Sequence, residues 1–71
     1  MFRYYLLLSD DEFNRVLVKK NIETREEKYF NPTNNNWEAI GIMIRYFWPD
    51  SDTYDMYEEL TEEEAMEIVS M

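Results

Sequence analysis

The first apolar segment, residues 2–8, has one charged residue, Arg3, and predicts a β-strand, in which successive side chains point to opposite faces. One face of that strand would carry Phe2, Tyr4, Leu6 and Leu8, and the other Arg3, Tyr5 and Leu7. Because both faces are largely apolar, we expect both to be covered, as in a central strand of a sheet.

The next stretch, residues 9–20, fits two patterns. A capping-box pair, Ser9 and Glu12, precedes apolar residues at helical spacing, which indicates a helix. The β-branched residues around Leu17 and the polar run that follows them favour a strand instead. We therefore predict a strand at about 13–20 and keep a helix over residues 10–20 as the open alternative.

Two polar segments come next. The charged alternation of residues 23–30 predicts a third strand with one solvated face, at an edge of the sheet. The run of proline, threonine and asparagine at residues 31–36 predicts a loop.

Residues 37–48 carry an apolar stripe at helical spacing, which predicts a helix. Its members are Trp37, Ile40, Met43, Ile44 and Phe47. Gly41 weakens this helix, and Pro49 ends it because proline lacks the N–H that the helix needs.

The last third of the chain predicts an acidic loop at residues 49–53, a short strand at residues 54–60 and a final helix. The final helix has the strongest local signal, since Thr61 and Glu64 form a capping box and three glutamates meet the positive helix end. Ala65, Ile68 and Val69 would form its buried side. The expected fold is one small α+β domain over residues 1–71. In it, a three-stranded antiparallel meander is followed by a helix, a short strand and a C-terminal helix, and no internal repeat is found.

Composition agrees with a folded domain, since the 71 residues include twelve aromatics and one glycine. Disordered acidic segments are poor in aromatic residues. The distribution of charge is more informative about function. Residues 46–71 hold nine acidic residues and no basic one, which accounts for the net charge of −9. The same segment holds aromatic residues, so we expect it to be a binding surface.

Several kinds of chemistry are disfavoured. The chain has no histidine and no cysteine, so the usual pairs of nucleophile and base cannot form, and we expect no enzyme and no cofactor. A calcium loop starting at Asp50 would have Asp55 in place of the glycine and Thr61 in place of the final glutamate. We therefore expect no metal site.

Direct binding to nucleic acid is disfavoured because phosphate contacts depend on lysine and arginine. Membrane binding is disfavoured for the same reason, and no apolar run reaches the roughly 18 residues of a membrane span. We expect a cytoplasmic protein.

The predicted function is a non-enzymatic module whose acidic segment docks on a basic protein surface. Its most concrete form is an inhibitor or decoy that mimics nucleic acid in the groove of a host-defence nuclease. Small size, strong acidity and the lack of catalytic residues make the chain similar in type to phage-encoded inhibitors that mimic nucleic acid. The predicted partner-binding residues are Asp50, Asp52, Asp55, Glu58, Glu59, Glu62 and Glu63, with Trp48, Tyr54 and Tyr57 as anchors.

The alternative is a small structural subunit or homo-oligomer with an ordinary acidic face. It would be held together by the aromatic stripe of residues 37–48. The direction in which those aromatics point distinguishes the two hypotheses.

Overall fold

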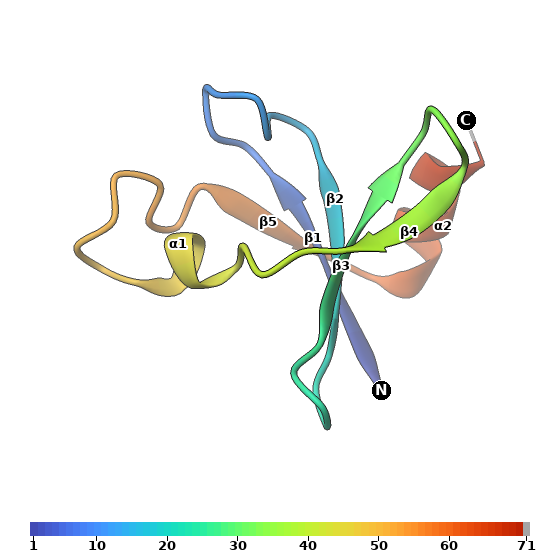
Figure 1. The fold of residues 1–71 in the computed structure, drawn as a ribbon, viewed down its shortest axis with the longest axis horizontal. Helices are drawn as coiled ribbons and strands as arrows, with labels where there is room; N and C mark the ends of the chain where they lie inside the picture. Colours follow the sequence, from blue (N-terminus) through green and yellow to red (C-terminus); the bar gives the residue numbers. More distant parts are fainter. Residues whose placement is uncertain (71) are drawn as a thin grey trace.

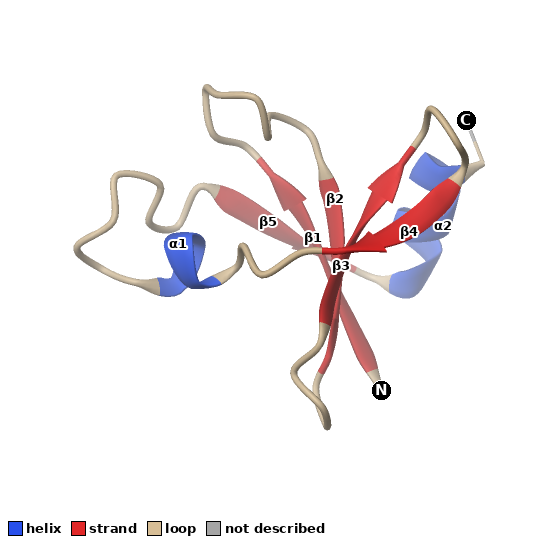
Figure 2. Cartoon of the chain, viewed as in Figure 1, coloured by secondary structure: helices blue, strands red, loops and turns tan. Residues whose placement is uncertain are grey.

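A five-stranded antiparallel sheet of order β4-β3-β2-β1-β5 forms the centre of the molecule (Figures 1 and 2). The computed structural model describes residues 1–70. The elements are β1 (Phe2–Leu7), β2 (Leu17–Asn21), β3 (Glu27–Asn31), β4 (Asn36–Ala39), α1 (Ile44–Phe47), β5 (Tyr57–Leu60) and α2 (Glu62–Val69). The predicted α+β class is confirmed. No helix within residues 1–70 is long and apolar enough to cross a membrane.

Strand β1 lies in the interior of the sheet, as its two apolar faces predict. Tyr5 is paired with Val18 of β2 on one side and with Glu59 of β5 on the other. The first four strands follow one another as neighbours, so β3 lies between β2 and β4 and its predicted edge position is wrong. The chain then passes through α1 and returns to the far side of β1 as β5, which is an edge strand.

The predicted three-stranded meander is wrong, because the sheet has five strands. The main error is the predicted helix at residues 37–48. Residues 36–39 form β4 instead, where Trp37 is paired with Phe30 of β3 and the two ring centroids are 5.4 Å apart. Only residues 44–47 are helical, and the exposed Gly41 lies in the connection between β4 and α1.

The other predicted strands are displaced at their starts. Residues 13–16 belong to a turn and to the connection after it, so β2 begins at Leu17 and the helical alternative over residues 10–20 is wrong. In the same way β3 begins at Glu27 and β5 at Tyr57, because the residues before each strand form a turn.

One type of five-residue turn causes all these late starts. In each turn the first side chain accepts a hydrogen bond from the N–H two residues later, and the fifth residue has a left-handed backbone. The turns are Asp11–Arg15, Asn21–Arg25, Asn31–Asn35 and Ser51–Asp55, with N–H···O distances of 2.9, 2.9, 3.0 and 3.3 Å and fifth-residue φ angles of 63°, 63°, 59° and 63°. The chain therefore reuses a turn at intervals of ten or twenty residues, a recurrence that the sequence analysis did not find.

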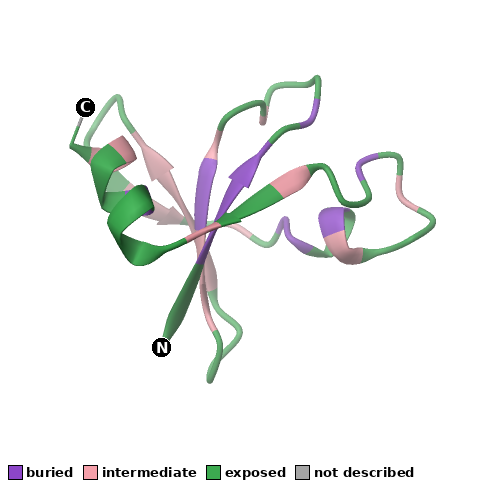
Figure 3. Ribbon diagram, turned by 180° about the vertical axis from the view of Figure 1, so that it is seen from behind, coloured by how far each residue is buried: buried purple, intermediate pink, exposed green. Residues whose placement is uncertain are grey.

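Apolar side chains cover both faces of the sheet. On the face that carries α1, here the α1 face, Tyr5, Leu7 and Val18 pack with the fully buried Met43 and Tyr46. On the opposite face, here the α2 face, Tyr4 and Leu17 pack with Ala65 of α2. Figure 3 shows the buried positions concentrated in β1, in β2 and in α1.

The N-terminus of α2 has the predicted capping box. The Glu64 N–H donates to Thr61 Oγ1 at 3.2 Å, and the Thr61 N–H donates to Glu64 Oε1 at 2.9 Å. Thr61→Ala removes the first bond, so we expect the free energy of unfolding to fall by about 1 kcal/mol. Chemical denaturation measures the loss. Thr33→Ala is the matched control, because Thr33 is an exposed turn residue, and an equal loss in both variants would contradict the role of the cap.

Candidate functional site

The carboxylate of Glu27, on β3, holds the start of α1. Its Oε1 accepts hydrogen bonds from the backbone N–H groups of Ile42 at 3.0 Å and Met43 at 2.9 Å. Its Oε2 lies 3.5 Å from Lys20 Nζ, and the Glu27 side chain is 11% exposed. A helix of one turn has little stability of its own, so this side chain and the burial of Met43 fix its position.

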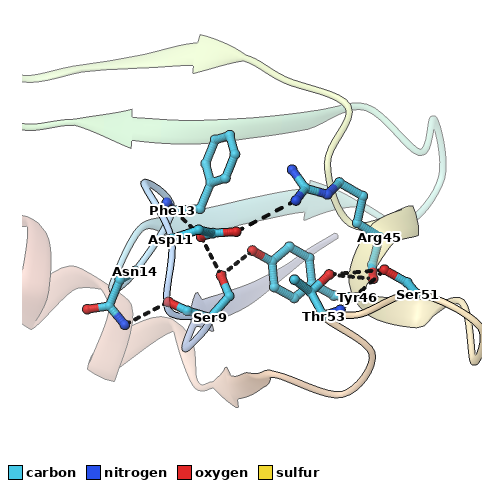
Figure 4. Close-up of polar contacts among 8 residues, drawn as sticks. All are labelled: Ser9, Asp11, Phe13, Asn14, Arg45, Tyr46, Ser51 and Thr53. Atoms are coloured by element: carbon cyan, nitrogen blue, oxygen red, sulfur yellow. Dashed lines mark hydrogen bonds and ion pairs between the residues drawn. The ribbon is translucent and has the colours of Figure 1, made fainter.

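A chain of polar contacts ties the other end of α1 to the turn after β1 (Figure 4). The buried hydroxyls of Tyr46 and Ser9 are hydrogen bonded at 2.7 Å, and Ser9 Oγ donates to Asp11 Oδ1 at 2.7 Å. The second Asp11 oxygen lies 3.6 Å from the Arg45 guanidinium. Ser9 is 1% exposed, so its hydroxyl positions α1 and is not accessible to a substrate.

The hydrogen bond from Ser9 lowers the pKa of the Asp11 carboxyl, with further contributions from the Phe13 N–H and the charge of Arg45. A carboxyl whose pKa is lower in the folded state stabilises the fold above its unfolded pKa, about 3.9. That contribution is lost as pH falls through the folded pKa. We expect Asp11→Asn to be less stable than the parent at pH 7, and the difference to disappear as pH falls through the folded pKa.

Denaturation curves across this pH range test the prediction. Asn21 and Asn31 occupy the first position of their own turns, so asparagine at position 11 preserves the turn and removes only the charge. The control is Asp10→Asn at the exposed neighbouring residue. A difference for Asp11→Asn that does not depend on pH would contradict the role of its charge.

Residues 49–56, here the acidic loop, follow α1 and are fixed by their own backbone and by Thr53. Thr53 Oγ1 donates to the Arg45 carbonyl at 2.8 Å, and the Asp55 N–H donates to the Tyr46 carbonyl at 2.9 Å. The side chains of Asp50, Asp52 and Asp55 are exposed. A well-bonded loop therefore presents three carboxylates to solvent.

The remaining predicted acidic residues continue from this loop along β5 to α2. Glu58 is paired with Leu6 and lies on the α2 face, whereas Glu59 is paired with Tyr5 and lies on the α1 face. Glu62 and Glu63 lie in the first turn of α2. Figure 1 shows α1 with the acidic loop at one end of the long axis and α2 at the other. The predicted acids thus follow one another from the acidic loop, along the edge strand β5, into the first turn of α2, and they are not gathered on one face. This run, residues 50–63, is here the acidic edge.

Few of these acids are neutralised. Among residues 1–70, five ion pairs are present, and only the one between Glu59 and Arg3, at 3.9 Å, involves an acid from residues 46–71. Lys19 lies over the rings of Phe2 and Trp37, at 5.0 and 4.4 Å from their centroids. Burial and the charge of Lys28 lower the pKa of Lys19. Lys19, Lys20, Lys28 and Arg45 are therefore engaged away from these acids.

The three predicted aromatic anchors occupy different environments. Trp48 is 58% exposed and Tyr54 is 48% exposed. Tyr57 is half-buried on the α1 face, where its ring packs edge-on against Tyr5 at 5.5 Å and Phe47 at 5.3 Å. Burial, and then the charge of Asp55, raise the pKa of the Tyr57 phenol. Trp48 and Tyr54 are thus accessible, whereas Tyr57 contributes to the core.

Ile44 belongs to the apolar stripe that sequence predicted, and it is 67% exposed. Ile44 and Trp48 are four residues apart, and residues i and i+4 lie on one side of a helix. This spacing is the sequence feature that indicates that the two side chains lie together. An open groove of about 370 Å³ lies between them and is lined by Ile44, Arg45, Trp48 and Ser51.

No group of three or more acidic side chains within the described residues is arranged to hold a metal ion. The exposed carboxylates are separate along the acidic edge, which suits contacts with several positive groups.

Comparisons with protein-family models, with curated proteins and with solved structures find no match to this chain.

Proposed function

We propose that this chain is a non-enzymatic interaction module that docks on a basic protein surface through its acidic edge. The observation that carries the proposal is that, of the nine acids in residues 46–71, only Glu59 has an ion-pair partner within the described residues. Unpaired exposed charges of one sign steer a partner of opposite charge and select among partners. Trp48 and Tyr54 are exposed beside these charges, and residues of these two types dominate binding hot spots.

The most concrete form of the proposal is a decoy that occupies the nucleic-acid groove of a host-defence nuclease. A run of exposed carboxylates along the chain supports this form, because a groove that binds DNA meets a linear series of phosphates. The central part of this run is β5, whose four residues Tyr57–Leu60 extend about 13 Å at about 3.3 Å per residue. Duplex DNA presents about one charge per 1.7 Å of axis, so the acidic edge would imitate a short, less densely charged segment.

The experiment is capture of a partner from the native host at low salt, followed by titration calorimetry with the purified partner. We expect the affinity to fall as salt rises, because exposed charges are screened beyond about 8–10 Å at physiological ionic strength. Added duplex DNA should compete with the module for the partner. A partner whose binding is indifferent to both salt and DNA would contradict the decoy form, and indifference to salt alone would contradict docking by charge.

The homo-oligomer alternative depended on a continuous aromatic stripe at residues 37–48. Trp37 packs on the α2 face and Phe47 on the α1 face, both within one copy of the chain. Of the three aromatics Trp37, Phe47 and Trp48, only Trp48 is exposed. The aromatics therefore do not form one continuous surface for a second copy.

A further inference from the structure

The groove beside α1 adds a second type of contact to the acidic edge. Ile44 and Trp48 form its walls from the exposed side of α1, and they are 67% and 58% exposed. Clustered exposed apolar residues with a polar rim mark interaction sites. Its volume of about 370 Å³ is more than twice the roughly 150 Å³ that holds a benzene molecule in an engineered cavity. One aromatic side chain would therefore fit.

Arg45 also lines the groove, but its charge is directed elsewhere. The guanidinium lies 3.6 Å from Asp11 Oδ2 and 5.4 Å from the centroid of the Phe13 ring. Arg45 therefore offers its aliphatic stem to the groove, as long cationic side chains commonly do. The exposed charges that follow the groove along the chain are those of Asp50, Asp52 and Asp55 in the acidic loop.

The geometry points to a docking site for a basic segment of a partner protein that inserts one aromatic side chain between Ile44 and Trp48. Lysine or arginine residues on either side of that aromatic would contact the acidic loop. This inference rests on the proposed function and specifies the chemistry of the partner. Charge complementarity selects this occupant over a second copy of the chain, because two copies joined here would bring two unpaired acidic loops together.

The test uses three synthetic nine-residue peptides. The first has a phenylalanine between two runs of four lysines. The second has serine in place of the phenylalanine, and the third has glutamate in place of the lysines. Binding to the full chain is followed by NMR, since the chain has two tryptophans with separate indole N–H signals. Trp37 is half-buried against Phe30 and serves as the internal control.

We expect the phenylalanine peptide to bind at least about tenfold more tightly than the serine peptide, and the glutamate peptide not to bind. The Trp48 indole signal should shift, and the Trp37 signal should not. Ile44→Ser and Trp48→Ala should each reduce the preference for phenylalanine over serine to about twofold or less. Met66→Ser is the matched control, because Met66 is 40% exposed on α2, and it should leave the preference unchanged.

The outcomes separate this inference from the proposed function. Equal, salt-sensitive binding of the phenylalanine and serine peptides would overturn the groove inference and leave docking by charge intact. Failure of both lysine peptides to bind would overturn both proposals. Dimers in sedimentation that Trp48→Ala abolishes would show a second copy in the groove and would also overturn the inference. Two wall variants are used so that a folding defect in one does not remove the test.

Discussion

Replacing Glu27 by alanine is expected to lower the free energy of unfolding by about 3 kcal/mol, a large fraction of the roughly 4–10 kcal/mol of a domain this size. The carboxylate accepts from the N–H groups of Ile42 and Met43 and is paired with Lys20. Alanine leaves both donors without their partner at the edge of the core, at about 1–3 kcal/mol for each donor that becomes unsatisfied. It also removes the counter-charge of a lysine whose side chain is only 21% exposed.

Chemical denaturation measures this loss, and Glu26→Ala is the matched control. Glu26 precedes Glu27, its side chain is 62% exposed, and its contact with Lys28 at 3.5 Å is of the kind that contributes about 0–1 kcal/mol. Glu27→Gln keeps an oxygen acceptor for the two N–H groups and loses the charge, so its stability should lie between those of the parent and Glu27→Ala. A loss for Glu27→Ala no larger than the loss for Glu26→Ala would show that α1 does not depend on this carboxylate.

The same variant bears on the proposed binding surface. Trp48 and the acidic loop follow α1 directly, and the loop is hydrogen bonded to the carbonyls of Arg45 and Tyr46. If Glu27 holds α1 in place, then amide hydrogen exchange in residues 48–55 should accelerate in Glu27→Ala more than exchange in β1, which retains both of its neighbouring strands.

The elements that sequence predicted well are those with a local cause. The two apolar faces of residues 2–8 predicted an interior strand, because both faces of such a strand need cover. The pair Thr61 and Glu64 located the start of α2, since a capping box involves only residues within one turn of the helix.

The segment 37–48 was mispredicted because two periods overlap in it. Its apolar residues match helical spacing, yet Trp37 is held in β4 by pairing with Phe30, a contact made across the turn at Asn31–Asn35. That turn needs a left-handed fifth residue, and Asn35 has a φ of 59°. Asparagine tolerates this conformation better than most residues. Interpreting residues 31–36 as a tight hairpin turn, and not as an open loop, would have predicted β4.

The candidate site was predictable in composition but not in arrangement. The acids of residues 46–71 are exposed, as their charge requires, with no base in that segment to pair with them. The placement of Glu58 and Glu59 at an edge of the sheet depends on β5 being its last strand. That position is set by pairing with β1, fifty or more residues earlier in the chain, and no local pattern reveals such a pairing.

Neutralising five carboxylates of the acidic edge together is expected to weaken partner binding by between about 30-fold and about 150-fold. The variant replaces Asp50, Asp52, Asp55, Glu58 and Glu59 by the corresponding amides. Exposed ion pairs contribute about 0–1 kcal/mol each, so any single replacement should change the affinity by less than about fivefold. Five contributions near the middle of that range add to about 2–3 kcal/mol, which gives the expected factor.

The fold should tolerate these five replacements. The side chains are exposed, and their one ion pair, between Glu59 and Arg3, is long and solvent-accessible. Asp55 has a left-handed backbone with a φ of 63°, and asparagine is also tolerated there. Denaturation midpoints near that of the parent would confirm that a loss of affinity is not a loss of structure.

A control variant with the same net charge as the edge variant distinguishes an effect of the acidic edge from an effect of net charge alone. Amide replacement of five other exposed acids, Asp10, Glu12, Glu23, Glu26 and Glu67, also changes the net charge from −9 to −4. If the acidic edge contacts the partner, the edge variant should lose most of the salt dependence of binding, measured by calorimetry at several salt concentrations. The control variant should retain most of it, because charges more than about 8–10 Å from the contact are screened. Equal losses in the two variants would mean that net charge alone attracts the partner, and parental affinity in the edge variant would mean that the acidic edge is only a solvated surface.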